Sequence, residues 1–219
     1  MKRSQSGFTL IEIAIVLVII GLLLGGVLKG QELINSAKVK NLAGDFKSIP
    51  VFIYGYQDKF KALPGDDANV ATHVTGGTPC TPPAAGLCAP GNGIIDGAWN
   101  AGAITSESYV FWQHVRLAGL APGPTDTAAS DYAPLNAVGG RIGITNATAS
   151  PISGLKGSYV ICSNAIAGKF AKQLDTTLDD STTNTGSVQV IAAGTTTAAS
   201  AVTNAGVLDD TTYLVCMGI

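Results

Sequence analysis

A single carboxylate inside an apolar run is the most unusual chemical feature of this sequence. Glu12 is the fifth residue of a run that opens at Phe8 and continues to Leu28. An ionised side chain at that depth of a bilayer costs on the order of 3 kcal/mol unless a partner neutralises it. We therefore expect Glu12 to have a cationic partner.

The partner that the sequence offers is an amine created by proteolysis. Lys2 and Arg3 belong to a short polar leader that ends at Gly7, immediately before the apolar run. Cleavage between Gly7 and Phe8 would free an amine on Phe8, one helical turn from Glu12. An amine beside a carboxylate, in the same chain or in a neighbouring subunit, removes most of the cost of burying the charge. The pair would then fix the register of a helix that enters a bundle of such helices.

Two simpler explanations of the apolar run stay open. The run from Phe8 to Leu28 is long enough for one bilayer crossing, which takes roughly 20 apolar residues. A secretory signal peptide would end in a cleavage site of small residues, and no such site follows Leu28. A plain membrane anchor explains the length of the run but gives Glu12 no role. Processing before the run accounts for more of the pattern than either alternative.

Paired oxygen ligands are the other residues that could do chemistry. Three groups could contribute to a calcium site, which takes about six to eight oxygens: Asp66 with Asp67, Asn92 with Asp96, and Asp179 with Asp180. None has the spacing of an EF-hand, and each is also typical of a turn or a helix end. We assign no metal ligand and expect no cofactor. Calcium is the one ion for which the sequence offers candidate ligands. The sequence contains no GxSxG, P-loop or HExxH motif, so we predict that the protein is not an enzyme.

The four cysteines predict disulfides. They all follow the apolar run, an even number of them favours pairing in an exported domain, and four cysteines allow three pairings. We favour Cys80–Cys88, which closes a short loop, and Cys162–Cys216, because each of the latter two ends an apolar, strand-like segment. The spacing matches no zinc site.

The charge of the chain argues against a nucleic-acid partner. The formal charge is −2, and loss of Lys2 and Arg3 with the leader would make it −4. Only 13% of the residues are charged, which suits close packing against copies of the same chain as well as an ordinary exported surface.

A long amino-terminal helix must position Glu12. Beyond Leu28 the apolar residues recur at alternating spacings of three and four, which predicts one buried stripe: Val39, Leu42, Phe46, Ile49, Ile53, Tyr56, Phe60 and Leu63. A helix from Phe8 to about Lys61 would be roughly 80 Å long. We expect Gly25-Gly26 to weaken it, Pro50 to kink it and Pro64-Gly65 to end it.

The remaining segments predict an α+β domain with long loops. Residues 66–100 read as surface loop, and 106–118 as a helix that Ser106 caps, with Trp112 and His114 as packing residues. A second helix is expected from Ser163 or Asn164 to Leu178. Four strands are expected, at residues 141–145, 158–162, 187–192 and 211–216.

The amino-terminal pattern resembles the class III leader of type IV pilins and type II secretion pseudopilins. The resemblance is carried by Lys2-Arg3, Gly7, the segment from Phe8 to Glu12 and the aliphatic run that follows. It implies that a prepilin peptidase cuts after Gly7 and methylates the Phe8 amine. It also implies that Glu12 is needed for subunit assembly, which an inner-membrane platform and a cytoplasmic ATPase drive.

Short segments later in the chain resemble one subgroup of these proteins. They are the segment from Tyr56 to Asp66, Trp112-Gln-His, Leu117-Ala-Gly-Leu, and Leu178-Asp-Asp with Thr185-Gly. That subgroup has glycine after the acid pair, whereas this chain has Ser181. The resemblance therefore does not predict the conformation of the turn at this residue.

These observations predict a pilin-like α+β fold with four parts: a leader (1–7), a transmembrane and assembly helix (8–28), an amphipathic continuation (29–63) and an extracytoplasmic domain (64–219). We expect a subunit of a homo-oligomeric type IV pilus, held in the inner membrane by one span before assembly and on the cell surface afterwards. The alternatives are a pseudopilin of a periplasmic type II secretion pseudopilus and a membrane-anchored binding module that never polymerises.

Overall fold

The computed structural model describes residues 9–81, 87–195 and 198–219, and it has the expected α+β architecture. The chain divides into two compact units, Met1–Lys38 and Val39–Ile219. Helix α1, Leu10–Phe60, contributes to both of them. The division at residue 38 marks the beginning of the packed body, whereas the expected boundary at residue 28 marks the end of the apolar run.

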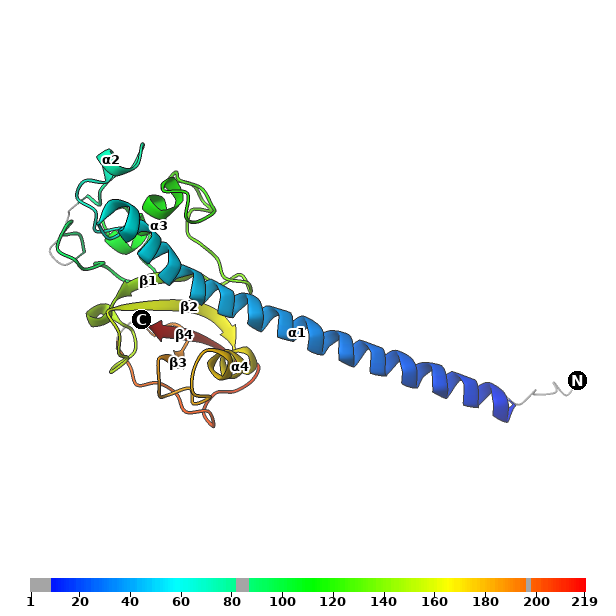
Figure 1. Cartoon of the computed structure of the whole chain (residues 1–219). Helices are drawn as coiled ribbons and strands as arrows, with labels where there is room; N and C mark the ends of the chain where they lie inside the picture. Colours follow the sequence, from blue (N-terminus) through cyan, green and yellow to red (C-terminus); the bar gives the residue numbers. More distant parts are fainter. Residues whose placement is uncertain (1–8, 82–86, 196–197) are drawn as a thin grey trace, which may run out of the picture. The chain divides into compact units, whose positions relative to one another are not determined.

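The second half of α1, which Figure 1 shows beside the sheet, carries the predicted apolar stripe. The stripe is buried. Val39, Leu42, Phe46, Ile49, Ile53 and Tyr56 are at most 5% exposed, while Val51 and Tyr54 on the same turns are more than 60% exposed. Phe60 is only partly buried and Leu63 is buried beyond the helix end. The 3–4 spacing therefore found the packed face correctly.

Helix α1 is unbroken through Gly25, Gly26 and Pro50, so the expected weak points do not interrupt it. It ends at Phe60 because Lys61 takes a positive φ of 54°, which a continuing helix cannot contain. Gly65 then turns the chain with φ 94°, and a Cβ there would lie 2.6 Å from the carbonyl oxygen of Glu107. Glycine is required at this crossing of two segments.

The sheet is antiparallel throughout, with strand order β1-β2-β4-β3 (Figure 1). Its strands are β1, Ile142–Asn146; β2, Tyr159–Ala167; β3, Val188–Ala192; and β4, Thr212–Gly218. All four lie where the sequence predicts strands. Cys162 and Cys216 are register partners on β2 and β4, and their Cα atoms are 4.1 Å apart.

The two faces of the sheet contribute to different apolar clusters. Alternate residues such as Ile144, Ile161 and Val215 pack with side chains of α1, of α3 (Glu107–Leu117) and of α4 (Gly168–Leu178). The other face holds the Cys162–Cys216 disulfide among Val160, Ile191, Leu214 and loop residues. This alternation is what a sheet covered on both faces requires.

The structure corrects the boundary between β2 and α4. We expected a helix from Ser163 or Asn164, but β2 continues to Ala167 and α4 begins at Gly168. An irregularity between Ser163 and Ile166, with Ala165 at φ 58°, lets the strand resume its pairing up to Ala167 opposite Thr212. Ile166 therefore packs from a strand, although its spacing to Phe170 also fits a helix.

Two further expectations about the loops and helices were wrong. The segment 66–100 contains a short helix, α2, Val70–His73, and it buries Asp66 and Asp67 rather than lying wholly at the surface. Ser106 precedes α3 but makes no side-chain cap, because its hydroxyl lies against the carbonyl oxygen of Asp96 and the hydroxyl of Ser108. A 3₁₀ turn, η1, Ala147–Ala149, is capped instead by the side chain of Asn146.

Candidate functional site

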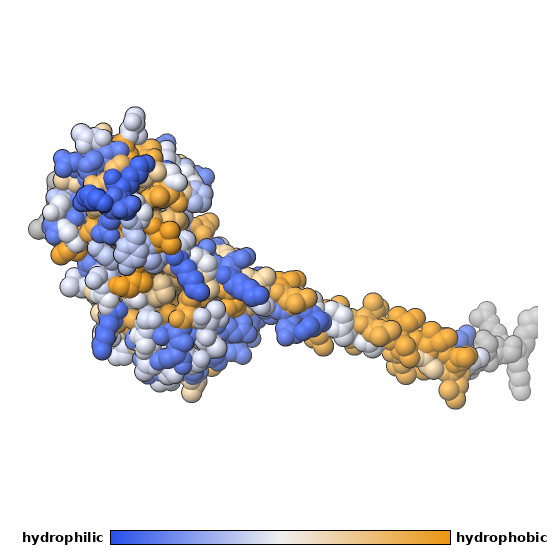
Figure 2. Space-filling model, viewed as in Figure 1, coloured by the Kyte–Doolittle hydropathy of each residue, from blue (hydrophilic) through white to orange (hydrophobic). Residues whose placement is uncertain are grey.

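The first half of α1 is an apolar helix whose side chains are exposed within the described chain. The exposed large apolar side chains from Leu10 to Ile34 show between 47% and 89% of their surface. Figure 2 shows that apolar surface predominates along the part of this helix toward the amino terminus. The helix is long and apolar enough to cross a membrane, with a mean hydropathy of 2.8 over 18 residues. Lipid or other copies of the helix would satisfy this surface.

Glu12 lies in the first turn of this helix and its carboxylate is bound by Thr9. The backbone N–H and the hydroxyl of Thr9 both donate to Oε2 of Glu12, at 2.8 and 2.7 Å. In return the backbone N–H of Glu12 donates to the Thr9 hydroxyl oxygen at 3.3 Å. This reciprocal arrangement is a capping box, and it places a negative charge at the positive end of the helix.

Thr9 is not among the partners that the sequence predicted for Glu12. A Thr followed three positions later by Glu, just before an apolar run, is a recognised signal for the start of a helix. The box gives Glu12 a neutral partner within its own chain. Gly7 and Phe8, where we expect cleavage and methylation, lie outside the described residues, so the structure reports on the carboxylate and not on the amine.

Residues 2–28 match the model of the prokaryotic N-terminal methylation motif. The chain therefore has a pilin-type amino terminus. The match contains Gly7, Phe8 and Glu12, and it identifies the class III leader of type IV pilins and pseudopilins, which a prepilin peptidase processes. No curated protein and no solved structure matches the chain.

The pilin-type leader and the exposed apolar helix indicate membrane anchoring before assembly. They also indicate a structural protein rather than an enzyme. The leader is common to pilins and pseudopilins, and it does not distinguish between them.

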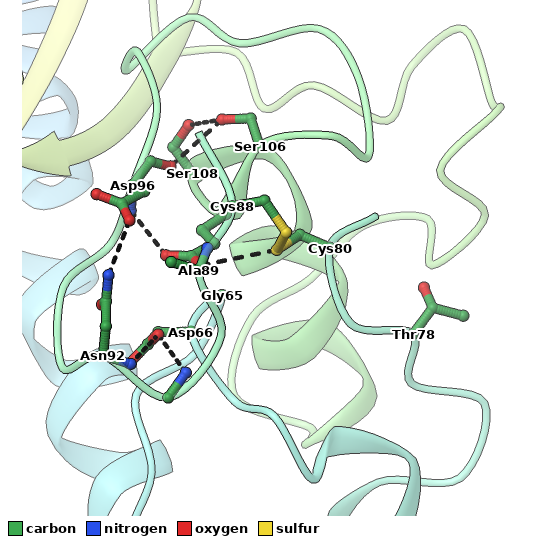
Figure 3. Close-up of a disulfide and its surroundings, with 12 residues drawn as sticks. Gly65, Asp66, Thr78, Cys80, Cys88, Ala89, Asn92, Asp96, Ser106 and Ser108 are labelled. Carbon is green, nitrogen blue, oxygen red and sulfur yellow. Dashed lines mark hydrogen bonds between the residues drawn. A yellow bond between two sulfur atoms is a disulfide. The ribbon is translucent and has the colours of Figure 1, made fainter. Parts of the chain in front are cut away.

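Figure 3 shows the Cys80–Cys88 disulfide of the Val39–Ile219 unit. Sγ of Cys80 lies 3.7 Å from Oε1 of Glu107. Glu107 is fully buried and accepts backbone N–H groups from Ala89 at 2.7 Å and Asp96 at 2.8 Å. Burial raises the pKa of Glu107 to about 7 against these hydrogen bonds, and the nearby charges of Asp66 and Asp96 add to the rise. Both sulfurs are in the disulfide, so this group offers no thiolate to a metal.

Asp66 and Asp67 use their oxygens to hold loops together. Asp66 accepts the backbone N–H groups of residues 91, 92 and 93 at 2.6 to 3.0 Å (Figure 3). Burial raises the pKa of Asp67, but hydrogen bonds from His73, Tyr56 and the backbone of Asn69 outweigh burial, and the pKa lies below its usual value. Both carboxylates have clear structural roles without a cation.

A surface cleft of about 660 Å³ adjoins this acidic pair. Its lining includes Asp67 hydrogen-bonded to His73 at 2.7 Å, a pair that orients the base in many hydrolases. Its lining residues include no serine, threonine or cysteine that could act as the nucleophile. The His73 ring instead stacks on Phe60, with centroids 5.4 Å apart, and fastens α2 to the end of α1.

Trp112 and His114 are packing residues, as predicted, and both are buried. Burial lowers the pKa of His114, and its neutral ring bridges two loops. Nδ1 accepts the N–H of Gly65 at 2.9 Å, which fixes the tautomer, so Nε2–H donates to the carbonyl of Thr78 at 2.9 Å.

Asn92 and Asp96 are likewise joined to each other, by a 2.9 Å hydrogen bond from the Asn92 amide. The last of the three acidic groups, Asp179 with Asp180, follows α4 and lies beside Asp175, a residue that the sequence reasoning did not single out.

Proposed function

We propose that the chain is a structural subunit of a type IV pilus, cut after Gly7, methylated on Phe8 and polymerised through α1. The observation that carries this proposal is the exposed apolar helix from Leu10 to Leu28, in which Glu12, in the first turn, is the one carboxylate. Such a helix needs an apolar environment along its length and a cation at one end. A bundle of identical processed helices supplies both.

In the proposed mechanism the helices leave the bilayer and pack into the core of a filament. Glu12 of one subunit pairs with the Phe8 amine of a neighbour, and the Val39–Ile219 units cover the outside. Moving an apolar helix from lipid to a helix bundle yields little free energy, because lipid is already apolar. The direction of assembly must therefore come from an assembly platform and its ATPase.

The disulfides favour a pilus over a pseudopilus, with the pseudopilin as the alternative. Two disulfides cross-link the Val39–Ile219 unit. Cys80–Cys88 closes a short loop, and Cys162–Cys216 joins the paired strands β2 and β4. Such cross-links suit a filament exposed outside the cell. Immunogold labelling of intact cells separates the two candidates, because surface fibres support the pilus and fibres confined to the periplasm support the pseudopilus.

Replacing Glu12 by Ala tests assembly, with Glu32→Ala as the matched control. Glu32 is also on α1 and exposed, but it pairs with Lys29 at 2.7 Å beyond the apolar run. We expect Glu12→Ala to abolish sheared fibres while the protein stays in the membrane fraction, because the charge that fixes the register is gone. Glu32→Ala should assemble normally.

Equal fibre yields from Glu12→Ala and the unchanged chain would contradict polymerisation through this pair. That result would favour a membrane-anchored binding module. Loss of both fibres and membrane protein in Glu12→Ala alone would also count against the proposal, since it would assign Glu12 to insertion rather than assembly.

A further inference from the structure

Asp175 is a fully buried acid whose carboxylate accepts no hydrogen bond from the described residues. It lies in the last turn of α4, is 0% exposed, and neither of its carboxylate oxygens has a hydrogen-bond partner among the described residues. Other buried acids are different, since Asp66 accepts three backbone N–H groups and Glu107 accepts two. A buried carboxylate without donors is costly, and it calls for a compensating group.

The groups around Asp175 increase the free-energy cost of burying its charge. Oxygens of Asp175, Asp179 and Asp180 lie within 4.8 Å of one another, and all three are at the carboxyl end of α4, which carries a partial negative charge. The lysines of α4 are engaged elsewhere, with Lys169 facing Asp210 at 3.8 Å and Lys172 facing Asp209 at 3.0 Å. Among the described residues, no ion pair balances the three carboxylates.

The three carboxylates keep enough oxygens to bind a cation. Asp179 uses Oδ2 to accept the backbone N–H of Val188 at 2.9 Å. Asp180 accepts one hydrogen bond on each oxygen, from the N–H of Thr182 and the hydroxyl of Thr185. A carboxylate has about four lone-pair sites, so free positions remain on both residues besides the two oxygens of Asp175.

The three carboxylates extend from the interior to the surface. Asp175 is buried, Asp179 is half-buried and Asp180 is exposed. An ion would approach from the Asp180 side, where water can complete its coordination.

We propose that Asp175, Asp179 and Asp180 form a binding site for one divalent cation, and that the cation is Ca²⁺. The donors are all carboxylate oxygens, which suit hard cations, whereas zinc prefers nitrogen and sulfur. Ca²⁺ accepts irregular geometry and several carboxylates, while Mg²⁺ requires a near-octahedral set and retains most of its water. The bound ion would fasten the end of α4 to the start of β3, because Asp179 already contacts Val188.

Calorimetric titration of the full chain in a non-ionic detergent, first stripped with a chelator, tests the site with CaCl₂ as the probe. We expect one Ca²⁺ per chain with a Kd of about 10⁻⁴ to 10⁻³ M, the range of extracellular calcium modules. Asp175→Asn should weaken binding by at least about tenfold, since a ligand charge is lost. Asp209→Asn, an exposed acid in a pair with Lys172, should bind as the unchanged chain does.

Thermal unfolding of the same variants supplies a second readout. Ca²⁺ should raise the Tm of the unchanged chain and of Asp209→Asn, but not that of Asp175→Asn, whose Tm without calcium should be no lower than that of the unchanged chain. Should Asp175→Asn fail to fold, Asp180→Asn at the exposed side decides by the same loss of response. Absence of calcium binding to the unchanged chain, or equal binding by all variants, would overturn the proposal.

Discussion

Asp67 and Glu107 are both buried acids, yet their pKa values move in opposite directions. Burial acts on both carboxylates, but Asp67 has the hydroxyl of Tyr56 and the ring of His73 as donors, and these hold its pKa below the usual value. Glu107 has two backbone donors and two acidic neighbours, so burial prevails and raises its pKa to about 7. The partner of a carboxylate, rather than its depth, decides its charge.

Glu107 should make stability depend on pH. Its native pKa of about 7 lies above its ordinary value of 4.5, so between these values the unfolded chain has released a proton that the native chain keeps. Stability is therefore greatest at low pH with respect to this group, and it falls as pH rises from about 4.5 to about 7. Glu107→Gln should remove part of this slope, as measured from urea unfolding midpoints at several pH values.

Glu32→Gln is the control for this slope, because Glu32 is exposed on α1. A slope that is the same in Glu107→Gln and Glu32→Gln would contradict the assignment. Glu107→Gln is also expected to be less stable overall. The two backbone N–H groups bind different oxygens of Glu107, and glutamine has a donating NH₂ group in place of one of them.

Ser181 occupies a backbone position that favours glycine. Its φ of 69° lies in the left-handed region, so the turn at this residue forms at a cost in strain. Ser181→Gly should stabilise the chain by about 0.5 to 1 kcal/mol. Gly186→Ala is the opposite case, because Gly186 has φ 71° and a Cβ there would lie 2.0 Å from Oδ2 of Asp179.

Chemical denaturation of both variants with a chelator present measures these effects. We expect Gly186→Ala to lose at least about 1 kcal/mol. A Ser181→Gly variant less stable than the unchanged chain would show that the serine side chain itself is required.

At the scale of elements, α1 was predictable because its signal is long and repeated. The apolar residues from Val39 to Leu63 give one face at helical spacing, and a single continuous helix follows to Phe60. The β2–α4 boundary was not predictable in the same way. The spacing of four between Ile166 and Phe170 fits a helix, while the strand is fixed by pairing with β4, about fifty residues later in the chain.

The packed half of α1 offers a direct test at this scale. Phe46 is 0% exposed within the main core cluster, so Phe46→Ala should cost about 3 to 5 kcal/mol by leaving a cavity. Val51, on the next turn but 63% exposed, is the control, and Val51→Ala should change stability by no more than about 0.5 kcal/mol. Equal losses in the two variants, measured by denaturant unfolding, would contradict the assignment of the buried face.

The candidate sites differ in how far local sequence determines them. Glu12 is conspicuous because its neighbours in sequence are apolar, and Thr9 could have been found from its spacing to Glu12. The burial of Asp66 could not have been predicted, since it depends on a segment distant in the sequence. The donors to Asp66 are 25 to 27 residues away, and no local pattern marks them.

At the scale of the whole molecule, the chain combines two units suited to different surroundings. Val39–Ile219 has its own buried core and two disulfides, as expected of an exported domain. Met1–Lys38 has the methylation motif and an exposed apolar helix. In the proposed mechanism, trimming of the leader would create the Phe8 amine that pairs with Glu12 during assembly.

Mass spectrometry of the amino-terminal peptide of the protein purified from its native membrane tests this account most directly. The account predicts a chain that begins at Phe8 and carries one methyl group on the Phe8 amine. A chain that still begins at Met1, or one that is cut beyond Leu28, would contradict it.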